Sequence, residues 1–185
     1  MGGFSSGGNV SLLLADYLQS SASAIQVKGL FVVDSPIDLM ALYDNAQQTI
    51  ERNVSQVAVQ EANWIVGTFD ADFGHGDTAL AHYNARSPYH AKTRHTANLS
   101  HLQGISIRLY TEPDTAWMRV NRQARYENMN AYYLEKLAAD LAAMYGESQV
   151  EYVTTETEAT APMERGIRIA GRLWIGRLVE WMGRE

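Results

Sequence analysis

Cysteine is absent from this chain of 185 residues. Disulfides, thiol nucleophiles and cysteine-ligated metals are therefore excluded. The chain also has no apolar run of about 18 residues, the length that a membrane-spanning helix needs. It has no recognisable signal peptide, which favours a cytoplasmic location. Its histidines form no HxxxH or HxH pair of the kind that holds a metal. We therefore expect no metal, no cofactor and no membrane span.

Positive charge is also scarce. Lysine and arginine number 15 against 21 aspartates and glutamates, which gives a net charge of −6. The densest basic cluster is Lys92, Arg94 and His95. Such scattered cations argue against nucleic acid or an anionic membrane as a partner. The apolar share of 46% and the charged share of 19% are those of a globular protein, long enough for one domain with a core.

Hydrophobic periodicity predicts strands that alternate with helices. The run 29–33 is short, apolar and β-branched, as in a strand buried on both faces of a parallel sheet. An α/β fold with a parallel sheet follows from this alternation. The predicted helices are 9–20, 37–52, 57–69, 78–84, 131–146 and 176–185, and the predicted strands are 29–33, 105–111 and 149–155.

Local signals refine two of these helices. Asn130 is expected to cap the helix that follows it, and Gly146 is expected to end that helix. In the first helix an apolar stripe recurs at helical spacing. Its members are Val10, Leu13, Leu14, Tyr17 and Leu18.

The chain opens with GGFSSGG, which has two interpretations. It is either a flexible linker or a turn from a strand into a helix that presents one serine. The second interpretation contains the pattern G-x-S-x-G at residues 3–7, with Ser5 at its centre. Ser5, the pair Asp34-Ser35 and the stretch 112–114 each fall where a strand ends. Because parallel strands end at one edge of a sheet, we expect these residues to share that edge.

In order and spacing the sequence resembles the second half of the α/β-hydrolase fold. GGFSSGG before a helix is similar to the nucleophile turn of that superfamily, and VVDSP, a helical stretch, SPY and IRLYTEPD follow in its order. The resemblance covers nearly the whole chain. It implies a single domain over 1–185, a three-layer α/β/α fold, and a helical lid over residues 36–99. It also implies that the superfamily's first half, including the strand leading into Ser5, is missing.

The resemblance implies a role for each site residue. Ser5 would be the nucleophile, and the backbone N–H of Ser6 would form half of an oxyanion hole. Asp114 would orient the catalytic histidine, unless it only caps a helix. Asp34 is the alternative acid, although Asp-Ser-Pro also suits a plain turn. The substrate would be an ester or thioester with an apolar part, hydrolysed through an acyl-enzyme without a cofactor.

The expected catalytic histidine is missing from its place, the stretch between about 155 and 177. The five histidines are His75, His82, His90, His95 and His101, and His75 is the alternative base. We therefore expect the chain as written to hydrolyse esters poorly or not at all. A non-catalytic binding or structural protein of the same fold is the alternative.

Residues 158–176 have neither strand nor helix periodicity. We predict that they are translated out of frame, because a reading shifted by one base can restore a histidine-containing segment, HPHSWSIVD, in that gap. Natural loss of the histidine is the alternative, and sequencing the gene against close relatives distinguishes the two.

Overall fold

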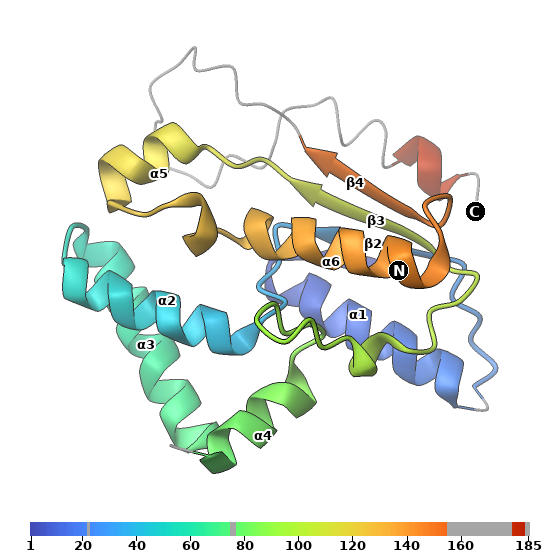
Figure 1. The fold of residues 1–185 in the computed structure, drawn as a ribbon, viewed down its shortest axis with the longest axis horizontal. Coiled ribbons are helices and arrows are strands. Elements are labelled where there is room, and N and C mark those ends of the chain that lie inside the picture. Colours follow the sequence, from blue (N-terminus) through green and yellow to red (C-terminus); the bar gives the residue numbers. More distant parts are fainter. Residues whose placement is uncertain (22, 75–76, 155–178, 184–185) are drawn as a thin grey trace.

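The computed structural model describes residues 1–21, 23–74, 77–154 and 179–183. These residues form an α/β fold around one four-stranded sheet, in which every pairing is parallel and the strand order follows the sequence. Figure 1 shows helices packed along the sheet and a group of helices beyond the ends toward which the strands point. The strands are β1 (Gly2–Phe4), β2 (Gly29–Val33), β3 (Ser106–Thr111) and β4 (Val150–Thr154).

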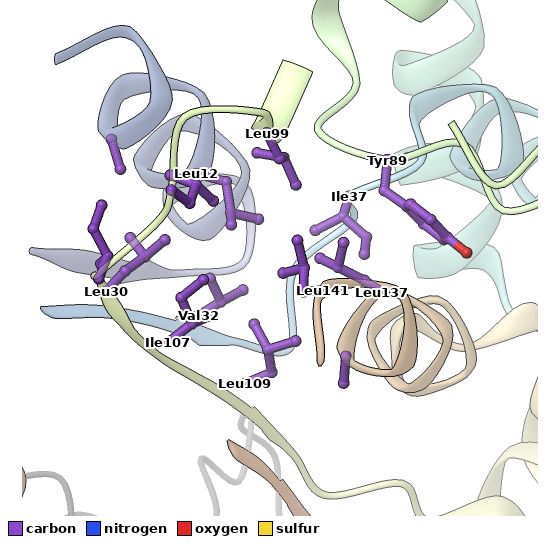
Figure 2. Close-up of a cluster of buried hydrophobic side chains, with 14 of the residues drawn as sticks. Leu12, Leu30, Val32, Ile37, Tyr89, Leu99, Ile107, Leu109, Leu137 and Leu141 are labelled. Carbon is purple, nitrogen blue, oxygen red and sulfur yellow. The ribbon is translucent and has the colours of Figure 1, made fainter. Parts of the chain in front are cut away.

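One face of the sheet carries the main core. Leu30 and Val32 of β2 and Ile107 and Leu109 of β3 are almost fully buried there, because alternate side chains of a strand point to the same face. Figure 2 shows these four side chains converging on leucines of two helices, with Tyr89 at the margin of the cluster. The predicted strands 29–33, 105–111 and 149–155 are thus confirmed to within one residue at each end, except that residue 155 lies outside the described residues.

Two helices, α1 (Ser6–Ser20) and α6 (Asn130–Tyr145), cover this face of the sheet. In α1 the buried apolar residues are Leu12 and Ala15. The apolar stripe seen in the sequence is therefore not the buried face of this helix. Three of its members, Val10, Leu14 and Tyr17, are 60%, 42% and 65% exposed. Apolar residues occur on two sides of α1, so periodicity alone could not identify the side that packs on the sheet.

The opposite face of the sheet has a smaller cluster. Trp181 lies against Val33 and Tyr110 and is 7% exposed. Residues 179–182 are helical, in agreement with the described part of the predicted terminal helix. The guanidinium of Arg108 lies 5.3 Å from the centre of the Trp181 ring and pairs with Glu151 at 2.5 Å. The sheet is therefore flanked on both faces.

Between β2 and β3 the chain forms a helical insertion. Its helices are α2 (Leu39–Arg52), α3 (Gln56–Phe73), α4 (Asp77–Arg86) and the short η1 (Ala97–Leu99). The predicted helices 37–52, 57–69 and 78–84 correspond to the first three of these. Asp38 and Ser55 accept hydrogen bonds from backbone N–H groups and so cap α2 and α3. An aromatic cluster joins the three helices through Tyr43, Phe69, Phe73 and Tyr83.

The connection from β3 to α6 contains two elements that the periodicity did not predict. They are α5 (Thr115–Arg122) and the short η2 (Tyr126–Asn128). The prediction for Asn130 is wrong, because Asn130 is the first residue of α6 and its amide donates instead to the backbone oxygen of Asp34. Gly146 does end α6, with a φ of 98°. None of the helices in the described ranges is both long and apolar enough to cross a membrane.

Candidate active site

Ser5 lies at the turn between β1 and α1. Its φ of 49° and ψ of −129° fall in a region that residues with a side chain rarely adopt. The predicted strand-to-helix turn at Ser5 is confirmed, and a linker at residues 2–8 is excluded. The expectation that no strand leads into Ser5 is wrong, because β1 pairs with β2 directly before it.

Three hydrogen bonds hold this backbone conformation. The N–H of Ser5 donates to the carbonyl of Val33 at 2.9 Å. The carbonyl of Ser5 accepts from the N–H of Gly8 at 3.0 Å and from the hydroxyl of Ser35 at 2.5 Å. Ser35 is fully buried, so its hydrogen bond is shielded from water. Such a set of contacts is what allows a strained residue to persist.

Two glycines are required by the close packing of this turn. A Cβ on Gly3 would lie 2.4 Å from the backbone carbon of Gly7. A Cβ on Gly8 would lie 1.9 Å from the hydroxyl oxygen of Ser35 and 2.8 Å from a methyl of Val32. The first glycine of G-x-S-x-G therefore lets the chain reverse. Gly8, just after the motif, lets α1 approach β2.

The hydroxyl of Ser5 is not used by the fold as a helix cap. Serine is a favoured N-cap residue, yet the Ser5 side chain makes no capping hydrogen bond, and the residue is exposed. Ser6 is the first residue of α1, so its N–H has no hydrogen-bond partner within the helix. An exposed hydroxyl thus lies beside an N–H group at the positive end of a helix.

Asp34 follows β2 directly and lies level with Ser5. Phe4 of β1 is in register with Val33 of β2, so Ser5 and Asp34 are the next residues of two strands about 4.8 Å apart. Asp34 has a φ of 44°. Burial by the surrounding protein raises the pKa of Asp34, although part of the residue is exposed to solvent. A hydrogen bond from Asn130 lowers this pKa, but by less than burial raises it.

Asp114 lies three residues beyond the end of β3, which is one strand farther from Ser5 than β2. One oxygen of its carboxylate accepts from the N–H of Trp117 at 2.8 Å and so caps α5. Ser5, Asp34 and Asp114 all follow the C-terminal ends of parallel strands, as expected. The cap on α5 is the structural role that the sequence offered as the alternative for Asp114.

None of the four histidines in the described ranges hydrogen-bonds to Ser5. His82 lies beside Arg86, and His101 contacts Asp16 with a ring nitrogen 3.0 Å from the carboxylate. His90 is 5% exposed, its Nδ1 is 3.9 Å from Asp38, and its backbone pairs with that of His95. These positions agree with roles in the insertion and its loops. His75, the alternative base, lies outside the described residues, as does the whole stretch 158–176.

Two residues make contacts at this sheet edge that the sequence does not indicate, Ser35 with Ser5 and Asn130 with Asp34. The sequence predicts a plain turn at Ser35, but the Ser35 hydroxyl donates to the carbonyl of Ser5 and the residue is fully buried. The sequence predicts a helix cap at Asn130, yet its side-chain amide donates to the backbone oxygen of Asp34, 96 positions away in the chain. Within the described ranges no three His, Asp or Glu side chains gather in a way that could hold a metal ion.

Comparisons of the chain with protein-family models, with curated proteins and with solved structures found no match. The turn at Ser5 and the sheet edge around it are therefore the features of the molecule that point to a function.

Proposed function

We propose that this chain belongs to a serine hydrolase of the α/β-hydrolase type, which acts on an ester or thioester through an acyl-enzyme. The observation that carries the proposal is the backbone of Ser5, held at φ 49° and ψ −129° between a strand and a helix with its hydroxyl exposed. Backbone strain of this kind concentrates at functional sites, and the G-x-S-x-G turn is one of the patterns in which it presents a serine.

The proposed reaction begins when the Ser5 hydroxyl attacks the carbonyl carbon of the substrate. Its proton passes to a base, the bond to the alcohol or thiol breaks, and that leaving group departs with a proton. Water then cleaves the acyl-enzyme and releases a carboxylic acid. In this proposal the N–H of Ser6, at the start of α1, would stabilise the negative oxygen that forms in each step.

We assign the acid of the site to Asp34, with Asp114 as the second candidate. Asp34 is level with Ser5 on the neighbouring strand, whereas Asp114 lies one strand farther away and already caps α5. In a chain with a working base, D34N would then lower the rate of acylation, and D114N would mainly lower stability.

The proposed site lacks a base at the expected place, because residues 155–178 contain no histidine. Loss of the base from such a site lowers the rate by about 10⁴-fold or more. The same observation favours the alternative function, a non-catalytic binding protein built on this fold. The experiment must therefore separate a reactive serine that lacks its base from a serine that is inert.

A fluorophosphonate reagent with peptide mapping by mass spectrometry makes this separation. We expect slow phosphonylation of Ser5 that accelerates when free imidazole is added as a substitute base. S5A should abolish the labelling, and S6A, which removes the neighbouring exposed hydroxyl, should preserve it. Equal labelling of several serines, or a rate at Ser5 that imidazole does not raise, would contradict the proposal and favour the binding protein.

A further inference from the structure

A cleft of about 240 Å³ lies between the helical insertion and the segment that follows β3. Residues of α2 and α3 line one side, and residues of α5 and η2 line the other. In Figure 1 these helices lie beyond the ends toward which the strands point. Ligands of α/β proteins bind in this region, outside the carboxyl ends of the strands. We call this the arginine cleft, after Arg52 and Arg122, which line it.

The arginine cleft combines an apolar lining with two cations. Leu42, Ile65 and Met118 supply much of the apolar surface, and small alanines between them leave the space open. Arg52 of α2 and Arg122 of α5 are both half-buried and line the cleft from different elements. The cleft therefore has room for an apolar chain and a charged group to receive its end.

Neither arginine pairs with a carboxylate within the described part of the chain. Arg52 donates to the neutral side chains of Gln48 at 2.7 Å and Asn128 at 3.2 Å. The guanidinium of Arg122 lies 5.2 Å from the centre of the Trp117 ring. Among the described lining residues the one acid is Glu61, which is exposed. Two half-buried cations against one exposed anion leave positive charge in the cleft for an anion to neutralise.

We propose that the arginine cleft binds a small organic oxyanion, an apolar chain that ends in a carboxylate or a phosphate. The oxyanion would lie on the planar fork of Arg122, with Arg52 as the second cation, and the chain would lie on the apolar lining. The protein as a whole carries a net charge of −6 and so repels anions at long range. Binding of an anion would therefore report this local site.

The inferred ligand is the far end of the hydrolase's substrate, an ester or thioester with an anionic tail. That identification rests on the proposed function, whereas binding of the oxyanion itself does not. The test therefore measures binding in the full-length S5A chain, in which no acyl-enzyme can form. If Ser5 is not labelled, the proposed binding of the anion is unaffected. If the anions do not bind, the proposed chemistry of Ser5 is unaffected.

Calorimetric titration with hexanoate, hexyl phosphate, hexanol and hexylamine tests the site. We expect hexanoate or hexyl phosphate to bind about tenfold or more tightly than hexanol, since a hydrogen bond to a charged group contributes about 1.5 kcal/mol or more. The tighter of the two anions identifies the group that the substrate carries. Hexylamine should not bind. Failure of both anions to bind, or equal binding of hexanol, would overturn the proposal.

R122Q should weaken binding of the anion about tenfold. R119Q is the matched control, because Arg119 lies on the same helix, is exposed and does not line the cleft. It should leave the affinity unchanged. R52Q should also weaken binding, but Arg52 joins α2 to Asn128 as well, so R122Q decides the question if R52Q fails to fold. Unchanged affinity in R122Q would contradict the proposal.

Discussion

Ser5 combines an unfavourable backbone conformation with an exposed side chain. Its φ of 49° costs a residue with a Cβ about 1–3 kcal/mol, a cost that the hydrogen bonds from Ser35 and Gly8 offset. A fold that needed only a turn at this position would be more stable with glycine. Serine at this position therefore lowers the stability of the fold and in return exposes a hydroxyl group.

We expect S5G to raise the free energy of unfolding by about 1 kcal/mol, because glycine relieves the strain at φ 49°. Urea denaturation followed by circular dichroism measures the change. S6G is the control: Ser6 is already helical, so glycine there should lower the free energy by about 0.5 kcal/mol. A loss of stability in S5G as large as that in S6G would show that Ser5 is not strained.

At the scale of the element, α1 shows how one helix can offer two apolar sides. Leu12 is fully buried, and Leu14, two positions later, is 42% exposed. The side against the sheet also contains Gly8, whose missing side chain permits the close approach to β2. Contact with the sheet, and not the hydrophobicity of the helix, decides which leucine stabilises the fold.

L12A should lower the free energy of unfolding by about 3 kcal/mol, because it removes buried methyl groups and leaves a cavity. L14A removes the same atoms from the partly exposed side and should change the free energy by less than about 0.5 kcal/mol. Thermal and urea unfolding of the two variants side by side measure this. Similar losses in both would mean that the exposed side of α1 also contributes to the core.

A polar contact joins α6 to the loop that closes the helical insertion. Asp140 of α6 accepts from the hydroxyl of Tyr89 at 2.7 Å and pairs with Arg94. In Figure 2 the hydroxyl of Tyr89 points away from the leucines of the core. The hydrogen bond from Arg94 holds the pKa of Asp140 below its usual value of 3.8, although burial acts in the opposite direction.

This lowered pKa predicts a dependence of stability on pH. Because the folded protein holds Asp140 ionised more strongly than the unfolded chain does, the contribution is present above about pH 4 and is lost as pH falls through the lowered pKa. D140N should therefore be less stable than the parent at pH 7, and the difference should shrink toward pH 3. D72N, on an exposed side of α3, is the control and should track the parent. A pH-independent difference would contradict the prediction.

For the whole molecule, the two faces of the sheet are covered unequally. The face under α1 and α6 contains the large core. The other face depends, within the described residues, on Trp181 and the side chains beneath it. The segment around Trp181 thus completes the packing of β2 and β3, so the integrity of that segment is a condition for stability.

W181A should lower the free energy of unfolding by about 3 kcal/mol, because Trp181 is only 7% exposed and packs on Val33 and Tyr110. W64A is the matched control: Trp64 of α3 is 69% exposed, and its loss should change the free energy by less than about 0.5 kcal/mol. Denaturation curves of both variants provide the measurement. Equal stability of the two would mean that the second face of the sheet does not need Trp181.

The sequence by itself determined the alternation of strands and helices and the parallel sheet, and it offered the turn at Ser5 as one of two interpretations. These features follow from local signals: the unbroken apolar run of β2, the glycines around Ser5 and the glycine that ends α6. Such signals act over a few residues, and so one sequence read in order is enough to detect them.

Only the tertiary structure decided which residues meet. The buried side of α1, the contact of Ser35 with the carbonyl of Ser5 and the reach of Asn130 to Asp34 all join positions far apart in the chain. The two arginines of the cleft are 70 positions apart and come together because α2 and α5 follow neighbouring strands. The hydrophobic periodicity of the sequence cannot predict such pairings, because they depend on the order of the strands in the sheet and on what each helix packs against.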